Sequence, residues 1–154
     1  MQDLKNNIGV VQSLAPAARD ADANGTGVDL QGFESATVVI DMGAEGITLS
    51  TTNKIEIELE HSDDDSTYTD VAQADIVDGT IDSGGIFLKL DGTAGGNPDT
   101  AGGIFRVEYV GNKRYIRVVL AKTGTHSNGT PIGAMVVRSG ARHSTDNAFT
   151  AHNS

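Results

Sequence analysis

The chain contains no cysteine, no tryptophan and only three prolines in 154 residues. Because it lacks cysteine it forms no disulfide, so nothing in it requires or suggests an oxidising compartment. No stretch approaches the roughly eighteen apolar residues of a membrane-spanning helix, and the N-terminal MQDLKNNIGVV lacks the basic start and the apolar run of a secretory signal. We therefore expect a protein with no membrane partner that folds in a reducing cytoplasm.

Basic residues are scarce as well, since 11 Lys and Arg stand against 21 Asp and Glu and the formal net charge is −10. This charge repels phosphate backbones, so we expect no nucleic-acid partner. The charge is unevenly distributed along the chain. Residues 54–83 carry ten acids and one base, a net −9, whereas residues 103–154 carry seven bases and two acids, a net +5. The sequence thus predicts an electrically two-ended molecule.

Helical periodicity is almost absent, and alternation of apolar and polar residues takes its place. The clearest case is Lys54–Glu60 (KIEIELE), whose isoleucines and leucine point one way and whose charges point the other, as in a half-buried antiparallel strand. Similar runs predict strands at Ala36–Met42, Ile86–Leu90, Ile104–Val110, Tyr115–Ala121 and Ile132–Arg138, with weaker candidates at Gly27–Leu30, Tyr68–Val71 and part of Ile8–Leu14.

Clusters of Gly, Asn, Asp and Ser separate these runs at regular intervals, a pattern typical of an all-β fold. We predict an antiparallel β-sandwich or jelly roll, formed as one domain by residues 20–140. Residues 1–19 and 141–154 are interpreted as N- and C-terminal arms that order only against a neighbour. The four-residue link 110–113 (VGNK) is predicted to be the turn of a β-hairpin.

Three consecutive carboxylates, Asp63, Asp64 and Asp65, raise the question of a metal site. A calcium loop spaces its acids at alternate positions and needs a glycine and a terminal bidentate glutamate, none of which this stretch provides. Asp and Ser readily cap backbone groups in tight turns, so SDDDST is predicted to be the bend between two strands. A weakly held surface cation is the alternative.

No pattern indicates catalysis. The four histidines, His61, His126, His143 and His152, are too far apart for a zinc motif and are interpreted as solvated groups of turns and tails. There is no G-x-S-x-G, and the Gly-rich TAGGNPDTAGG has no lysine and no helix pattern after it. We expect no enzyme, no metal and no cofactor.

Bases and an aromatic residue interleave at residues 113–117 (KRYIR). One interpretation is a strand whose outward face carries solvated bases. The other is a docking face for an acidic partner, which the uneven charge distribution favours.

Four blocks of the sequence carry a resemblance: LAPAARDADANGTGVDLQGFESATVVIDMG, IELEHSDDDSTYTDV, FRVEYVGNKRYIRVVLAKTGT and PIGAMVVRSGARH. Together they span roughly residues 10 to 143, and the chain resembles the capsid decoration, or cement, proteins of tailed bacteriophages. The resemblance implies a β-sandwich or jelly-roll subunit, commonly oligomeric, that binds the outer capsid lattice and clamps neighbouring capsomers. The Gly-rich stretch 91–103 and the tail after Arg142 depart from the shortest members of that family.

On this basis the expected partners are a major capsid protein and further copies of the chain, as a trimer by preference or as a dimer. The expected location is the outer capsid surface of a virion, after synthesis in the cytoplasm of a bacterial host. The acidic segment 54–83 would face solvent or a neighbouring copy. The residues predicted to dock on the capsid are Arg106, Lys113, Arg114, Arg117, Arg138, Arg142 and Phe149.

Two other functions remain open. A virion-displayed carbohydrate-binding module would fit a β-sandwich, although such sites use exposed aromatic rings and this chain has no tryptophan and three tyrosines. A head-completion or tail structural protein would instead form rings of subunits.

Overall fold

The computed structural model describes residues 7–93 and 102–142. These residues form ten β-strands and one single-turn 3-10 helix, η1 (Gln73–Asp75). The strands are β1 (Ile8–Arg19), β2 (Ala23–Asn24), β3 (Val28–Asp29), β4 (Ser35–Met42), β5 (Lys54–Ser62), β6 (Thr69–Asp70), β7 (Ile86–Leu90), β8 (Gly103–Tyr109), β9 (Tyr115–Thr123) and β10 (Thr130–Ser139).

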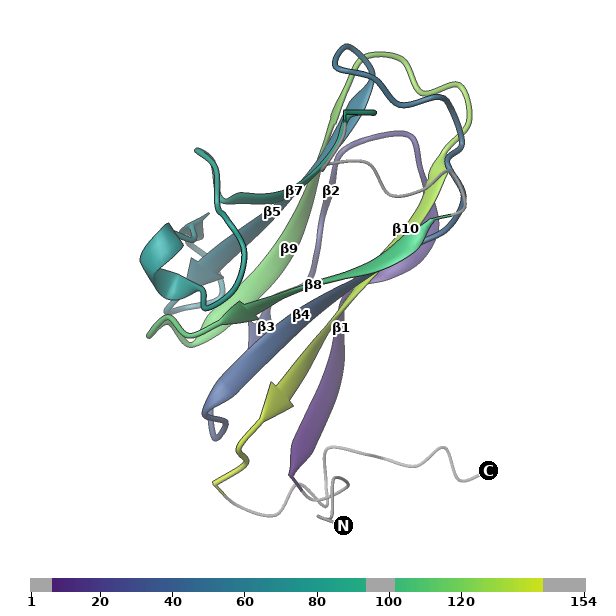
Figure 1. Ribbon diagram of the computed structural model, residues 1–154. Helices are drawn as coiled ribbons and strands as arrows, with labels where there is room; N and C mark the ends of the chain where they lie inside the picture. The colour runs from purple at the N-terminus through teal and green to yellow at the C-terminus, as the bar shows by residue number, and fades with distance from the viewer. Residues whose placement is uncertain (1–6, 94–101, 143–154) are drawn as a thin grey trace, which may run out of the picture.

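The strands form two antiparallel sheets that face each other (Figure 1). Sheet A has the order β1-β10-β4-β8. Sheet B is centred on the pair β9 and β5, with β2 and β3 beside β9 and with β6 and β7 beside β5. The chain passes repeatedly between the sheets, which gives the connectivity of a jelly roll. The predicted all-β antiparallel sandwich is therefore confirmed.

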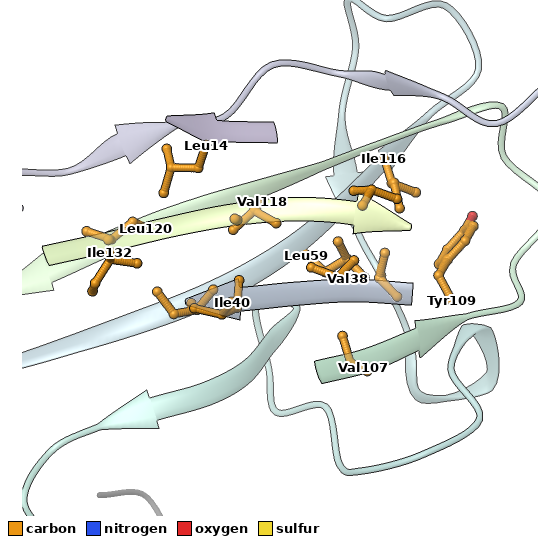
Figure 2. Close-up of a cluster of buried hydrophobic side chains, with 14 of the residues drawn as sticks. Leu14, Val38, Ile40, Leu59, Val107, Tyr109, Ile116, Val118, Leu120 and Ile132 are labelled. Atoms are coloured by element: carbon orange, nitrogen blue, oxygen red, sulfur yellow. The ribbon is translucent and has the colours of Figure 1, made fainter. Parts of the chain in front are cut away.

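The core lies between the sheets and follows from the alternation in the sequence. In β4 the inward side chains Val38 and Ile40 are fully buried, and in β5 the same is true of Ile57 and Leu59 (Figure 2). Burying one such side chain stabilises the fold by about 1.5–3 kcal/mol. Twenty-one apolar residues of the described chain are buried in this cluster, so the sandwich has a core of its own without cross-links.

All six strands predicted from clear alternation are present, with ends that differ by no more than two residues. The weaker candidates are also strands, as β1, β3 and β6. The turn between β5 and β6 is confirmed too, because these strands pair directly, with Glu60 opposite Asp70 and His61 opposite Thr69.

The predicted N-terminal arm is wrong for residues 8–19, which form β1 and pair with β10 from Ile8 opposite Ser139 to Arg19 opposite Thr130. The sandwich thus begins at Ile8 instead of residue 20. Two irregularities in the pairing, between Gln12 and Leu14 and between Leu14 and Ala17, interrupt the alternation that would have marked a strand. Residues 1–6, and residues 143–154 of the predicted C-terminal arm, lie outside the described residues.

The first irregularity in β1 turns Ser13 inward, where it ties sheet A to sheet B. The Ser13 hydroxyl donates to the Thr26 carbonyl oxygen at 3.0 Å and accepts the Val118 N–H of β9 at 3.0 Å. Gly25 must be glycine here, because a Cβ would lie 2.6 Å from both the Ser13 hydroxyl and the Val118 carbonyl oxygen. β1 is therefore anchored to both layers.

The predicted hairpin at residues 110–113 is wrong. Its flanking strands belong to different layers, since β8 pairs with β4 in sheet A and β9 pairs with β5 in sheet B. The link is held instead by the buried Tyr109, whose hydroxyl accepts the Lys113 N–H at 3.2 Å. Gly111 lies so close to this ring that a Cβ would be 2.4 Å from the hydroxyl. Segment 110–113 therefore crosses from one sheet to the other at one end of the sandwich.

Candidate interaction site

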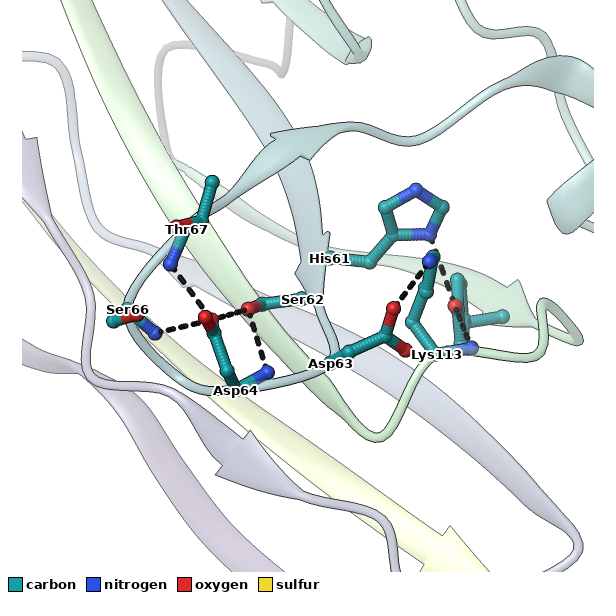
Figure 3. Close-up of polar contacts among 8 residues, drawn as sticks. His61, Ser62, Asp63, Asp64, Ser66, Thr67 and Lys113 are labelled. Carbon is teal, nitrogen blue, oxygen red and sulfur yellow. Dashed lines mark hydrogen bonds and ion pairs between the residues drawn. The ribbon is translucent and has the colours of Figure 1, made fainter.

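The carboxylate of Asp64 caps the turn after β5. It accepts the N–H groups of Ser66 at 2.9 Å and Thr67 at 2.8 Å, and the hydroxyl of Ser62 at 2.9 Å (Figure 3). These hydrogen bonds, the one from Thr67 foremost, hold the pKa of Asp64 far below its ordinary value. The Asp64 carboxylate is thus occupied by hydrogen bonds within its own turn.

The neighbouring carboxylates point to other partners. Asp63 forms an ion pair with Lys113 (Figure 3). Asp65 accepts a hydrogen bond from the hydroxyl of Tyr68. Asp65 can reach Tyr68 because its backbone has a positive φ of 59°. The three carboxylates therefore diverge, and the described part of the chain holds no group of three acids or histidines placed to share a metal ion.

A cleft of about 600 Å³ opens at the end of the sandwich where this turn lies. Its walls are the loop before β4 and the link between β8 and β9, which are far apart in the sequence. Its apolar lining includes Leu30, Phe33 and the edge of Tyr109. Three of the predicted docking residues line it together, Lys113, Arg114 and Arg142.

Two of these three bases already have acidic partners. Arg114 binds Asp29 with two hydrogen bonds, from Nε to Oδ1 at 3.1 Å and from Nη2 to Oδ2 at 2.7 Å, and this contact lowers the pKa of Asp29. Lys113 pairs with Asp63. Arg142 donates its backbone N–H to Gly32 at 2.9 Å, and its guanidinium pairs with no acid of the described residues.

Arg138 contacts Phe33, a residue of the cleft wall. Its guanidinium lies 4.3 Å from the centre of the Phe33 ring and donates from Nη1 to the Asp29 carbonyl oxygen at 2.6 Å. Its Nε is buried without an acceptor among the described residues, and burial lowers the pKa of the side chain. Arg138 therefore positions the cleft wall and is not placed to meet a partner first.

The other predicted docking residues lie elsewhere. Arg117 is on β9, where its Nε is 2.6 Å from Glu60 and its guanidinium lies 4.0 Å from the Tyr68 ring centre. Arg106 is exposed on β8 in sheet A. Phe149 is outside the described residues. The predicted set is thus not one surface, and only part of it gathers at the cleft.

The predicted separation of charge is not found in this region. β5 of the acidic segment pairs with β9 of the basic segment, which places Glu60 opposite Arg117. The loops that follow add the pair of Lys113 with Asp63. Two acids of the acidic segment, Glu60 and Asp63, are thus paired with bases of the basic segment that are far away in the sequence.

His61 is a feature that sequence reasoning missed, since it was interpreted as a solvated turn residue. It is buried, and its Nδ1 lies 3.0 Å from the hydroxyl of Tyr109. Burial lowers the pKa of His61 and raises the pKa of Tyr109 to about 12. The signal was available: His61 continues the inward series of Ile55, Ile57 and Leu59. His126 is likewise buried, with its Nε2 3.0 Å from the Thr123 carbonyl oxygen.

Comparisons with known proteins complete the description of the chain. No helix of the described residues is long and apolar enough to cross a bilayer. No protein-family model, no curated protein and no solved structure matches the chain.

Proposed function

We propose that this protein is a structural virion protein that binds the outer surface of a tailed-phage capsid and stabilises contacts between capsomers. It would be made in the bacterial cytoplasm and reside on the particle as a homo-oligomer. The proposal rests on the resemblance of its sequence blocks and on one structural observation. Lys113, Arg114 and Arg142 come from separate segments and converge on a single cleft with Leu30 and Phe33 in its lining.

The cleft suits an acidic segment of the capsid protein that also carries an apolar side chain. Arg142 makes the first contact, because its guanidinium has no acidic partner among the described residues. Lys113 and Arg114 exchange partners readily, since exposed ion pairs of this kind contribute only about 0–1 kcal/mol. The charges then set the rate of encounter, and the apolar lining slows dissociation.

The test is co-sedimentation with capsids from which this protein has been removed. Replacing the three cleft bases, Lys113→Gln, Arg114→Gln and Arg142→Gln, is expected to weaken binding at least tenfold and to flatten its dependence on salt. The measurement is the bound fraction over a concentration series at low and at physiological ionic strength.

A matched control removes the same charge at the opposite end of sheet B. Lys54→Gln, Lys89→Gln and Lys122→Gln also delete three bases, two of which are in ion pairs. This control is expected to bind capsids like the wild type. Equal binding by both triple variants would show that the cleft plays no part in docking.

The tail is tested separately with a chain that ends at Arg142. This truncation removes the predicted contact of Phe149 and leaves every described strand in place. Weaker capsid retention with unchanged thermal stability is expected. Retention equal to that of the full chain would remove Phe149 from the docking set.

A carbohydrate-binding function is less well supported, because Tyr109 is buried and a guanidinium covers one face of each of the other two tyrosine rings. Tyr109 is buried. Tyr68 lies under the guanidinium of Arg117, and Tyr115 under that of Arg114 at 4.9 Å. Sugars stack on exposed aromatic faces, so a glycan array is expected to give no specific signal.

A further inference from the structure

The outer faces of the two sheets differ in chemistry. On sheet B the outward side chains of β5 are the glutamates 56, 58 and 60, and their mutual repulsion adds to burial in raising the pKa of Glu58. On sheet A apolar side chains share the outward face with polar and charged ones. Val10 and Met135 are each 38% exposed and Ile104 is 66% exposed, which is unusual for a face that meets only water.

The pairing of the strands arranges this outer face of sheet A in rows that cross all four strands. One row contains Val10, Val137, Thr37 and Glu108. The next contains Gln12, Met135, Val39 and Arg106. A third contains Gly133, Asp41 and Ile104. Val137, Met135 and Val39 lie on the two middle strands with Thr37 and Asp41, whereas Ile104, Arg106 and Glu108 lie on the edge strand β8.

The face has a projection at one side and a hollow at the other. Ile104 projects from β8. The hollow, of about 280 Å³, lies over β1 and β10 and is lined by Val10, Gln12, Leu14, Pro16, Asp41, Gly133, Ala134 and Met135. It exists because Gly133 has no side chain: a Cβ there would lie 3.0 Å from the Pro16 ring.

We infer that the occupant of this face is a second copy of the chain, packed face to face about a two-fold axis parallel to the strands. Such an axis places β8 of one copy over β1 of the other, and β4 over β10. In this arrangement Ile104 enters the hollow of the partner at the level of Gly133, and Val39 lies on Met135. The inference rests on the proposed function in one respect: the proposed function requires an oligomer, and this face would form it.

The charges of the face fit the same arrangement. Arg106 lies opposite Gln12 of the second copy and Glu108 opposite Val10, so no two like charges meet. Arg106, Asp41 and Glu108 make no ion pair with another described residue. The charges of the face therefore do not oppose its pairing with a second copy.

The area of the face sets the strength of the contact. Four strands about 4.8 Å apart and three side-chain rows about 7 Å apart give roughly 400 Å² per copy, or roughly 800 Å² for two copies. Stable interfaces bury about 1,200–2,000 Å². The dimer is therefore expected to be reversible, with a dissociation constant in the micromolar range or weaker, and to be reinforced where copies are concentrated on a particle.

The first test is sedimentation equilibrium of the full chain over a concentration series, without capsids. The wild type dimerises, and Ile104→Asp raises the dissociation constant at least tenfold because it places a carboxylate in a hollow that is lined mainly by apolar side chains and by Asp41. Val77→Asp is the matched control, since Val77 is 62% exposed and belongs to none of the three rows. It leaves the dissociation constant unchanged.

A charge exchange tests the geometry itself. Gln12→Arg brings two guanidinium groups together across the two-fold axis and weakens the dimer about threefold to tenfold. Adding Arg106→Glu to Gln12→Arg restores it to within about twofold of the wild type. Within one copy these positions are three strands apart, about 14 Å, so the rescue can act only between copies.

Two outcomes overturn the inference. The first is a wild-type chain that stays monomeric up to about 1 mM. The second is an oligomer of any size, including a trimer or a ring, that the substitution Ile104→Asp does not dissociate. Because these measurements contain no capsids, a chain that stays monomeric would not contradict the capsid-binding proposal. A chain that does not bind capsids would likewise not contradict the dimer.

Discussion

The hydroxyl group of Tyr109 gives the sharpest prediction for the stability of the fold. The substitution Tyr109→Phe keeps the buried ring and removes one oxygen atom. That oxygen accepts the Lys113 N–H at 3.2 Å and lies 3.0 Å from Nδ1 of His61. With the N–H of Lys113 as donor, the hydroxyl proton is free to bind an unprotonated Nδ1. The one group thus holds both the crossing link 110–113 and the end of β5.

The magnitude follows from what the substitution leaves behind. Nδ1 of His61 lies in a buried side chain, and the Lys113 N–H is part-buried. A buried polar group that loses its partner costs about 1–3 kcal/mol. We expect a loss of about 2 kcal/mol, because water can reach the Lys113 side of the site. For a chain of this size that corresponds to a fall in Tm of about 4–8 °C.

The assay is urea unfolding at neutral pH, followed by circular dichroism and fitted with a common m-value. Tyr115→Phe is the control, because the Tyr115 hydroxyl makes no hydrogen bond among the described residues, and its effect is expected to stay within about 0.5 kcal/mol. If Tyr109→Phe and Tyr115→Phe unfold at the same urea concentration, the hydroxyl does not hold the link and the reasoning is wrong.

Three further predictions concern the core and its polar contacts. Ser13→Ala leaves the Val118 N–H without a partner and is expected to cost about 1–3 kcal/mol in urea unfolding, whereas an unchanged midpoint would mean that the tie between the sheets adds nothing. Leu59→Ala, at a fully buried site of β5, is expected to cost about 2–5 kcal/mol, and a loss below 1 kcal/mol would show that the core collapses around the gap. Burial lowers the pKa of His61 in the folded chain below its unfolded value of 6.5. As the pH falls below 6.5, the unfolded chain therefore binds the proton first, and the free energy of unfolding decreases until the pH reaches the folded pKa. His61→Gln is expected to remove this part of the pH dependence, and identical pH profiles of variant and wild type would contradict it.

Much of the fold follows from local pattern. β4 and β5 each bury every second residue, so alternation alone predicts the strand and the direction of its side chains. The turn after β5 could be predicted as well, because Asp and Ser cap such turns with their own side chains. These elements are decided within a few residues of chain.

β1 and the link 110–113 could not be predicted in this way. β1 contains two irregularities and Pro16, which hide its alternation, and its place is decided by the distant β10. In the link, residues 110–113 carry turn-forming groups that suit a hairpin equally well. The buried ring of Tyr109 and the separate pairing of β8 and β9 decide that the chain crosses between layers.

The candidate site is predictable only in part. The bases at 113–117 could be recognised as unusual, but the net charge of a segment does not reveal which acids will face it. The register of β5 with β9 places Glu60 opposite Arg117, and the loops bring Asp29 to Arg114. Arg142 reaches the cleft because the chain after β10 returns beside Gly32. These contacts depend on tertiary structure.

The pairing of β1 with β10 has a consequence for biosynthesis. The first strand of the sandwich finds its partner in the last, so sheet A cannot be completed until β10 has left the ribosome. Until then the nascent chain exposes the apolar side of β4 and an unpaired β1. We expect translation products that stop before Thr130 to be degraded, whereas chains that extend past Ser139 can complete sheet A and fold.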